Sequence, residues 1–362
     1  MNKLPVSYIE QPNGECWTFY KFAILKAHPV ATPWLATHVE FYINENMCGG
    51  YGNADCDYYR MRYYSDILSM TRIPVSDVTD DEIVSTICEE IDKGHYIVIY
   101  LNFNRIFRYN DDLRLHELLV YGYDKEREVF YCPMLTEGSF KEAELPFETI
   151  RLAYKDARDC YMQDGWRLLM MRSYYFGITA IRVRRDYLND NFAADLIDKI
   201  DHELHGMRII QTDLMQAELQ DRICYTGIAC YTGLSSCINS ALTEGVISKT
   251  MLFRLIRTLK MMCDYRKLFQ FAMDWFAETV KGENDSELLS IRSRYSACAD
   301  EVQRCYLMLC KYTQKENARL LESVRLTLDE LRIRESEILS TFRELIFKYY
   351  YQMNGVPVPP ED

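Results

Sequence analysis

The stretch His116–Cys132 reads HELLVYGYDKEREVFYC and joins two apolar runs by a charged connection. Leu115–Tyr123 and Val129–Cys132 are rich in β-branched and aromatic residues, whereas Asp124–Glu128 has the polar composition of a turn. The pattern therefore predicts a β-hairpin. Side chains alternate between the two faces of a strand, so His116, at the start of the first strand, shares a face with Leu118 and Val120.

The rest of the first half alternates short helices and strands, with Gly, Pro, Asn and Asp at the breaks. Between Thr79 and Gly94, a capping-box spacing precedes isoleucines at four-residue intervals, and the glycine is typical of a helix end. The same reasoning predicts further helices at Trp17–Ala27, Trp34–Tyr42 and Phe147–Ala157, and strands at His95–Asn102 and Trp166–Arg172.

The second half is expected to be helical almost throughout, because no proline occurs between Asn191 and Gln352. In Leu288–Tyr312 and Leu321–Tyr349, apolar residues recur at alternating three- and four-residue steps, interrupted only by Glu335. We expect these two segments to pack as long antiparallel helices. The predicted fold class is α+β, with a first domain at 1–184, a linker at 185–191 and a helical domain at 190–352.

Composition and charge exclude several function classes. The 362 residues suggest two domains, and the formal charge of −12 argues against nucleic acid or an anionic membrane as a partner. Thirteen cysteines are an odd number, and most lie among apolar residues, as free thiols do in a reducing compartment. No apolar run approaches the roughly 18 residues of a membrane span, and the first residues have no signal-peptide character. We therefore expect a cytoplasmic protein.

Cys16 is the first candidate for chemistry. It follows a turn at Asn13-Gly14 and opens a predicted helix, where unpaired N–H groups and the helix dipole stabilise a thiolate. A nucleophilic cysteine also needs a base, and His116 at the start of the hairpin is the second candidate. A strand-borne imidazole that faces a helix-borne thiol is the geometry of papain-like cysteine enzymes, in which the cysteine also precedes the histidine.

Four segments together resemble the butirosin biosynthesis protein H family. They are Gly14–Trp17 with its helix, Pro33–Leu35, Lys93–Tyr96 and the His116 hairpin, and they lie within residues 5–175. The hairpin also resembles that of the bacterial peptidases that cleave leader peptides after a double glycine. The resemblance implies a papain-like first domain and a link to peptide and aminoglycoside antibiotic biosynthesis. It further implies acyl transfer from a carrier-protein thioester to an amine.

The sequence departs from this pattern at two points. The family usually has an Asp near the end of the strand after the histidine hairpin, but Tyr131–Met134 contains no carboxylate. The group that orients the imidazole is therefore missing or comes from elsewhere. The papain-type oxyanion glutamine usually precedes the cysteine by six residues, whereas Gln11 precedes Cys16 by five. Gln11 is thus a shifted candidate for the oxyanion donor.

Other residues carry weaker signals. Trp17, Tyr58 and Tyr59 are candidates for substrate contacts, although such tyrosines are more often a half-buried strand surface. Asp201–His205 contains two histidines three residues apart, one short of the zinc-protease spacing, and is better explained as an exposed helix face. The glycine-rich segment Cys48–Gly52 has neither the strand nor the Lys of a phosphate-binding loop and is expected to be a flexible loop. No metal and no cofactor are expected.

Three functions remain open from the sequence. The first is cysteine-dependent acyl transfer or related amide chemistry, with an acyl-carrier or peptide substrate. The second is a non-catalytic papain-like protein that binds a peptide, a carrier domain or a synthetase, and the third is a cysteine peptidase. The apolar stripes of the long helices also allow a homodimer. The distance between the Cys16 sulfur and the His116 ring distinguishes an enzyme from a binding protein.

Overall fold

The structure is a computed structural model that describes residues 1–8, 16–44, 46–47, 49–51, 64–107, 113–136, 139–163, 177–187, 192–206, 208–211, 222–280 and 285–353. The chain forms two compact units. Unit 1 consists of Met1–Ala31 and Tyr59–Tyr187, and unit 2 of Thr32–Tyr58 and Leu188–Asp362. The fold is α+β with a helical C-terminal region, as predicted.

The described residues of unit 1 form two antiparallel four-stranded sheets. One has the order β4 (Leu68–Ile73), β10 (Ile178–Val183), β5 (Tyr96–Asn102) and β6 (Leu115–Val120). The other has the order β1 (Asn2–Lys3), β7 (Gly122–Asp124), β8 (Val129–Thr136) and β9 (Ser139–Pro146). Only Tyr121 separates β6 from β7, so the predicted first hairpin strand continues from one sheet into the other.

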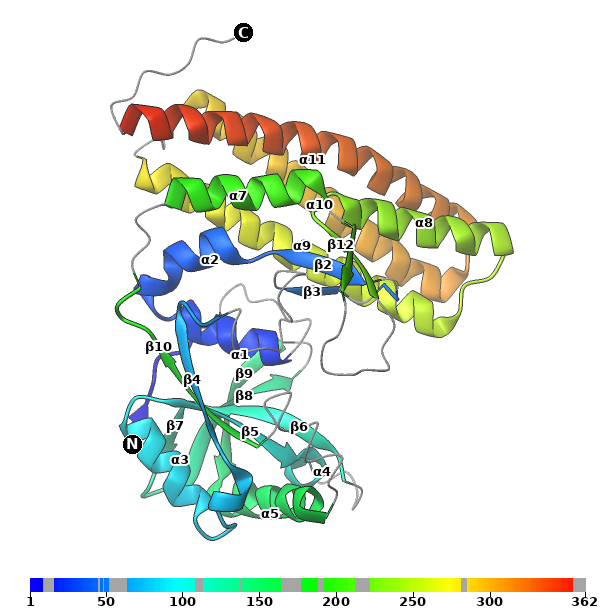
Figure 1. Cartoon of the computed structure of the whole chain (residues 1–362). Helices are drawn as coiled ribbons and strands as arrows, with labels where there is room; N and C mark the ends of the chain where they lie inside the picture. Colours follow the sequence, from blue (N-terminus) through cyan, green and yellow to red (C-terminus); the bar gives the residue numbers. More distant parts are fainter. Residues whose placement is uncertain are drawn as a thin grey trace. The chain divides into compact units, whose positions relative to one another are not determined.

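The helices of unit 1 lie on two sides of these sheets. They are α1 (Cys16–Leu25), α3 (Ile83–Asp92), the short α4 (Phe103–Phe107) and α5 (Phe147–Gln163). Figure 1 shows α1 on one side of the sheets and α3 and α5 on the other. The isoleucines of α3 belong to the same buried core as Leu118 and Val120 of β6. This side of the sheet therefore holds the main hydrophobic core of unit 1.

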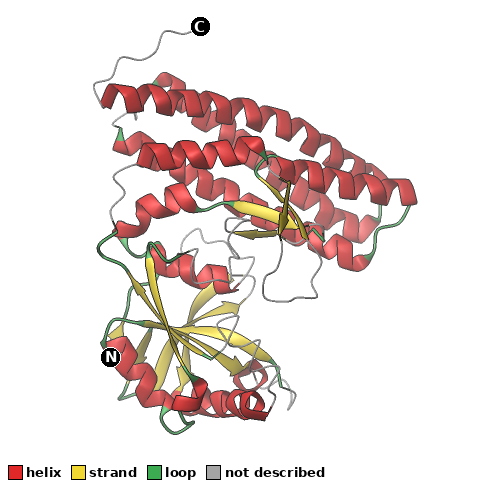
Figure 2. Ribbon diagram, in the orientation of Figure 1, coloured by secondary structure: helices red, strands yellow, loops and turns green. Residues whose placement is uncertain are grey.

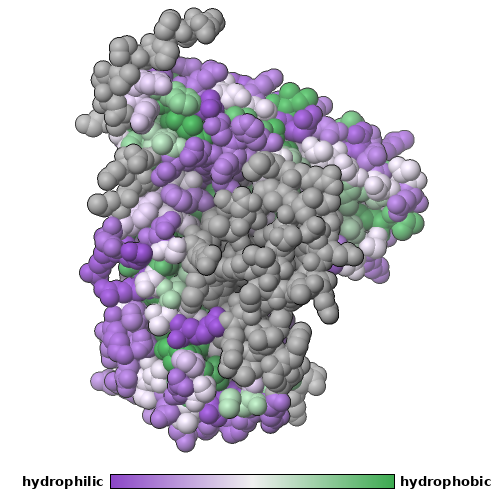
Figure 3. Space-filling model, viewed as in Figure 1, coloured by the Kyte–Doolittle hydropathy of each residue, from purple (hydrophilic) through white to green (hydrophobic). Residues whose placement is uncertain are grey.

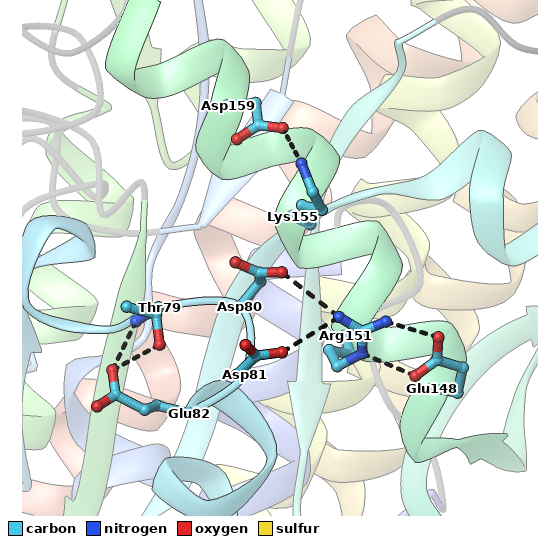
Figure 4. Close-up of polar contacts among 8 residues, drawn as sticks. All are labelled: Thr79, Asp80, Asp81, Glu82, Glu148, Arg151, Lys155 and Asp159. Atoms are coloured by element: carbon cyan, nitrogen blue, oxygen red, sulfur yellow. Dashed lines mark hydrogen bonds and ion pairs between the residues drawn. The ribbon is translucent and has the colours of Figure 1, made fainter.

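The predicted helix between Thr79 and Gly94 is α3, and its two ends follow from local chemistry. The backbone N–H and the hydroxyl of Thr79 donate to the Glu82 carboxylate over 3.0 and 2.7 Å (Figure 4). These bonds lower the pKa of Glu82 and brace the turn that leads into the helix. At the other end Gly94 adopts a φ of +84°, the left-handed conformation that terminates helices.

A second polar cluster joins α5 to the turn before α3. Arg151 forms a bidentate pair with Glu148, with both bonds at 2.7 Å, and reaches Asp80 and Asp81 at 3.4 and 3.5 Å (Figure 4). Because most of these carboxylates are well exposed, water screens the pairs and they contribute little to stability. They are best explained as a solvated surface network.

In its described residues, unit 2 is a bundle of helices with one small sheet. The helices are α2 (Thr32–His38), α7 (Phe192–His205), α8 (Ala229–Glu244), α9 (Lys249–Thr279), α10 (Ser286–Lys315) and α11 (Ala318–Met353). The sheet has the order β11 (Arg208–Gln211), β12 (Arg222–Thr226), β2 (Phe41–Asn44) and β3 (Gly49–Tyr51). Figure 2 shows this sheet as a small group of yellow strands among red helices.

The two long helices α10 and α11 confirm the predicted hairpin. Their apolar stripes are buried from Leu288 to Leu309 and from Leu321 to Ile346. The Asp285 side chain caps α10 by accepting hydrogen bonds from the backbone N–H groups of Glu287 and Leu288. Glu335, which interrupts the second stripe, is only 1% exposed and pairs with buried Arg266 at 2.8 Å. The interruption is therefore an internal ion pair.

Several boundaries differ from those expected. The predicted helix Trp34–Tyr42 ends at His38, because Phe41–Asn44 forms strand β2 and pairs with β12. For the same reason residues 32–58 belong to unit 2, although they were expected within a continuous domain at 1–184. Strands β11 and β12 also interrupt the half expected to be helical. In the expected glycine loop, Gly49–Tyr51 forms β3. The expected strand Trp166–Arg172 lies outside the described residues.

The described part of one face has small apolar areas (Figure 3), and most of the described cysteines are buried. On the described part of the face drawn in Figure 3, hydrophobic residues gather only in small, separate areas. Ten cysteines are described, all as free thiols, and seven of them are buried. Among the helices that the structure describes, none is long and apolar enough to cross a membrane. The homodimer expected through the long helices stays a prediction.

Candidate functional site

Helix α1 begins at Cys16, as the sequence predicts for the nucleophile. The first residues of a helix have backbone N–H groups without partners within the helix, and the helix dipole is positive there. The backbone position of Cys16 is thus suited to a thiolate. The side chains of Cys16 and Trp17 lie outside the described part of the structure, as do the other expected site residues Gln11, Tyr58 and Tyr59.

Aromatic residues of α1 attach the helix to the sheets. The Phe19 ring stacks on Phe140 of β9 with centroids 3.7 Å apart, and the Tyr20 ring meets the same phenylalanine edge to face at 6.2 Å. The Tyr20 hydroxyl donates to the backbone carbonyl of Glu117 in β6 over 3.1 Å. Because Phe19 and Tyr20 are both buried, these contacts fix the helix against the strand that begins with the histidine segment.

One contact from the middle of α1 and one from just beyond its C-terminal end indicate its direction relative to β6. Tyr20 is level with Glu117, near the start of the strand. Beyond the C-terminal end of the helix, His28 Nε2 lies 2.9 Å from the Tyr96 hydroxyl. Tyr96 precedes Ile97, which pairs with Val120 at the end of β6. The helix therefore runs in the same direction as the strand.

This direction brings the backbone of Cys16 level with the start of β6. Cys16 precedes Tyr20 by four residues, which is about 6 Å of helix at about 1.5 Å per residue. The same length covers about two residues of a strand. Two residues before Glu117 is Leu115, the first residue of β6, and His116 follows it. The order of the elements thus predicts that the two candidate residues lie at the same end of the sheet.

The His116 ring has a defined hydrogen-bonding state. Its Nδ1 lies 3.0 Å from the carbonyl oxygen of Glu117 and 3.4 Å from a carboxylate oxygen of the same residue. Both neighbours are acceptors, so Nδ1 must carry a proton. In the neutral ring Nε2 then has the free lone pair and can accept a proton. The ring is 31% exposed and rests on Phe103 with centroids 4.8 Å apart.

The Glu117 carbonyl therefore serves two donors. Tyr20 reaches it from α1 and His116 reaches it from its own strand, at 3.1 and 3.0 Å. A carbonyl oxygen has two lone pairs and can accept both bonds. One backbone atom thus links the helix that begins with Cys16 to the imidazole. Neither Tyr20 nor Glu117 was predicted as a site residue, although Tyr20 lies one helical turn after Cys16 and Glu117 directly follows the histidine.

Strand alternation adds a feature that was not expected. Leu118 and Val120, on the same face as His116, point into the core with α3 and α5, whereas α1 lies on the other side of the sheets (Figure 1). His116 is at the end of the strand, where its Nδ1 turns toward the carbonyl of Glu117. The distance from its ring to the Cys16 sulfur stays a prediction.

The segment expected to supply a third catalytic residue lies inside β8. Cys132 and Met134 are buried in the core of unit 1, and burial raises the pKa of the Cys132 thiol. The Tyr131 hydroxyl donates to the sulfur of Met1 over 3.6 Å, and its ring lies 3.5 Å from the ammonium nitrogen of Lys3. No side chain of this segment is thus available as a carboxylate partner for the imidazole.

The two histidines of Asp201–His205, a weaker candidate from the sequence, have hydrogen-bond partners within the protein. In α7, His202 Nδ1 lies 2.8 Å from Glu40, and His205 Nδ1 lies 2.6 Å from the backbone oxygen of Asp201. Glu203 is buried and accepts a bond from Tyr265. Within the described residues no group of three His, Cys, Asp or Glu side chains could hold a metal ion. The histidine pair thus belongs to a network of protein contacts.

Tyr64, which follows the expected substrate contacts Tyr58 and Tyr59 in the sequence, lies within the described residues. Tyr64 is 1% exposed, and the ammonium nitrogen of Lys21 in α1 lies 4.2 Å from the centre of its ring. A buried cation over an aromatic face is a stabilising contact. Tyr64 therefore belongs to the packing of unit 1.

Comparison with known proteins adds no assignment: no protein-family model and no curated protein sequence matches the chain.

Proposed function

We propose that the chain is a cysteine-dependent acyltransferase with a papain-like unit 1, in which Cys16 is the nucleophile and His116 the general base. The observation that carries the proposal is the shared acceptor. Tyr20 of the helix that begins with Cys16 and Nδ1 of His116 both donate to the Glu117 carbonyl. This arrangement leaves Nε2 of His116 as the basic nitrogen of the ring. It lies at the end of the sheet where we expect Cys16.

The reaction has two transfers. In the first, the Cys16 thiol gives its proton to His116 Nε2, and the thiolate attacks the carbonyl of an acyl thioester. The bond from the carbonyl carbon to the donor sulfur breaks, and the imidazolium returns the proton to that sulfur. In the second, an amine attacks the acyl group on Cys16 and gives a proton to His116. The carbon–sulfur bond to Cys16 then breaks, an amide forms, and the imidazolium returns its proton to the Cys16 sulfur.

The partner of Nδ1 favours a thioester over a peptide as substrate. In Cys–His and Ser–His enzymes a third residue, often a carboxylate, fixes the imidazole and stabilises its charged form. Here the nearest acceptor is a neutral carbonyl, and the Glu117 carboxylate is farther away, at 3.4 Å. A thioester has a good leaving group and needs less assistance than an amide. We therefore favour an activated acyl donor, such as an acyl-carrier thioester, over peptide cleavage.

A second function deserves a test because of the strand alternation. The face of β6 that carries His116 is the face toward α3 and α5, whereas α1 lies on the other side of the sheets. If the ring does not reach the Cys16 sulfur, unit 1 has the fold of a papain-like enzyme without its chemistry. The chain would then bind a peptide, a carrier domain or a synthetase.

Incubation with a small acyl thioester and an amine distinguishes the two functions. The acyltransferase predicts an acyl adduct on Cys16 by peptide mass and an amide product in solution. Cys16→Ala should abolish both, and His116→Gln should slow both by at least about 100-fold, the scale of general-base catalysis. Cys160→Ala, which removes a partly exposed thiol of α5, is the matched control. If wild type and Cys16→Ala are equally inert, the binding function is favoured.

A further inference from the structure

A short segment of unit 2, Ala36–Glu40, is held by three polar contacts from the helices around it. Lys199 of α7 donates to the Ala36 carbonyl over 2.8 Å. His202 Nδ1 lies 2.8 Å from the Glu40 carboxylate. The Tyr265 hydroxyl of α9 lies 3.3 Å from the carbonyl oxygen of Val39. We call Ala36–Glu40 the crossover segment, because it joins helix α2 to strand β2.

Tyr265 lies between two acceptors. Its hydroxyl is within hydrogen-bond distance of the Val39 carbonyl and also of the Glu203 carboxylate, and all three groups are buried. A phenol has one proton to donate. While Glu203 is ionised, the charge-assisted bond to the carboxylate is the stronger one, and the Val39 carbonyl receives no proton from Tyr265. The two acceptors therefore compete for one donor.

We propose that Glu203 and Tyr265 form a proton switch that fastens the crossover segment to the helices of unit 2. When the Glu203 carboxylate takes up a proton from solvent, its new O–H donates to the Tyr265 oxygen, and the Tyr265 proton turns to the Val39 carbonyl. When Glu203 loses the proton, the Tyr265 proton returns to the carboxylate. No other bond forms or breaks, and the inference does not depend on the proposed catalysis.

The charges around Glu203 favour the uptake of one proton. The described groups that face Glu203 include both acids and bases and come from every element packed against α7. They are Asp198, Lys199, Asp201 and His202 of α7, Glu40 of the crossover segment, Cys230 and Tyr231 of α8, Tyr265 and Arg266 of α9, Tyr295 of α10, and Glu335 and Arg343 of α11. Arg343 and Asp201 pair with each other nearer the surface. The buried part of this set has two cations, Lys199 and Arg266, and three carboxylates, so one added proton balances its charge.

The direction of the pKa shifts gives the pH range of the switch. Burial, opposed in part by Arg266, raises the pKa of Glu203 to about 7. The folded state thus binds a proton that the unfolded state has released, so the stabilisation is complete at low pH and is lost as pH rises through about 7. The Glu40 bond also raises the pKa of His202, which acts in the same sense. Burial lowers the pKa of Lys199 to about 8, which changes the pH dependence of stability only above the range of the switch.

Hydrogen exchange of the whole chain from pH 5.5 to 7.5 tests the switch. Protection factors, corrected for the intrinsic exchange rate, are compared for peptides that cover 36–44 and 150–160; the second lies in α5 of unit 1 and contains none of the groups that face Glu203. We expect protection at 36–44 to fall by about two- to tenfold across this range, as expected for one lost hydrogen bond. Protection at 150–160 should stay constant. Constant protection in both peptides, or an equal fall in both, would overturn the proposal.

Three variants separate Glu203 from its neighbours. Glu203→Gln cannot ionise and can donate to the Tyr265 oxygen, so 36–44 should stay protected at every pH. Tyr265→Phe removes the moving proton, so protection should be low and constant across the range. His202→Gln keeps a donor for Glu40 and should retain most of the pH dependence. If the dependence disappears in His202→Gln but persists in Glu203→Gln or Tyr265→Phe, the histidine and not the proposed switch is responsible.

Discussion

Tyr20 of α1 and His116 of β6 donate to the same atom, the carbonyl oxygen of Glu117, over 3.1 and 3.0 Å. The bond from Tyr20 sets the position of α1 along the strand, and the bond from His116 sets the tautomer of the ring. A change at either donor therefore affects both the helix that begins with Cys16 and the proposed base. This relationship gives the most specific predictions about the site.

Tyr20→Phe removes one of the two donors and leaves the aromatic packing in place. We expect the variant to lose about 0.5–1.5 kcal/mol of stability, the usual contribution of one hydrogen bond. Its rate of Cys16 acylation should fall several-fold, with a changed pH profile, because α1 is no longer fixed to Glu117. Tyr154→Phe is the matched control, since Tyr154 donates to the Val78 carbonyl over 3.1 Å on the α5 side of the sheet.

The pH–rate profile of acylation separates a positioning role from a purely structural one. If Tyr20 only stabilises unit 1, both Tyr→Phe variants should lose similar stability and keep the profile of wild type. A changed profile in Tyr20→Phe alone supports the link through Glu117. Equal profiles in all three proteins would contradict it.

Cys132→Asp tests whether β8 can supply the missing carboxylate. Cys132 is fully buried in the apolar core of unit 1, so the new carboxylate would lack a partner. We expect the variant to lose at least about 3 kcal/mol in urea unfolding, the scale of an uncompensated buried charge. Leu135→Asp, at an exposed position of the same strand, is the control and should be close to neutral. Faster acylation by a stable Cys132→Asp would contradict this account.

The sequence predicted the elements whose patterns are local. The four-residue spacing of Ile83, Ile87 and Ile91, with Gly94 at the end, sufficed for α3, and the long stripes sufficed for α10 and α11. These helices bury one regular face, so periodicity alone identifies them. The position of Cys16 at the start of α1 followed from the turn before it and the aromatic residues after it.

What the sequence could not predict depends on partners that are distant along the chain. Phe41–Asn44 becomes a strand because β12, more than 170 residues later, pairs with it. The role of Glu335 depends on Arg266 in another helix. The acceptor for His116 Nδ1 is a backbone carbonyl, which every residue type has, so no residue pattern identifies it.

Leu328→Ala tests the packing of α11 against its neighbours. Leu328 is fully buried in the stripe that faces the other helices of unit 2. Truncation to Ala should cost about 2–5 kcal/mol and lower the melting temperature, because it leaves a cavity. Leu326→Ala, two residues earlier and 48% exposed, is the matched control and should change stability little. Equal melting temperatures for the two variants would contradict burial of this stripe.

The Arg266–Glu335 pair should respond differently to single and double substitution. Glu335→Leu alone leaves the buried guanidinium without its carboxylate and should cost about 3–5 kcal/mol. Arg266→Met together with Glu335→Leu removes both charges and should be clearly more stable than Glu335→Leu. Thermal unfolding of the four proteins in this cycle measures the coupling. If the double variant loses the sum of the two single losses, the pair is not coupled.

The most direct test of the central claim is the pH–rate profile for alkylation of Cys16 by iodoacetamide, followed by peptide mass in wild type and His116→Gln. A Cys16 thiolate stabilised by the helix start and by His116 should react well below the pH of an ordinary thiol, whose pKa is about 8.5. Cys16 should also react ahead of the partly exposed Cys160, Cys237 and Cys310 in the same sample. His116→Gln should move the midpoint of the profile toward the ordinary value. A wild-type profile with an ordinary midpoint, or one that His116→Gln leaves unchanged, would contradict the pairing of Cys16 with His116.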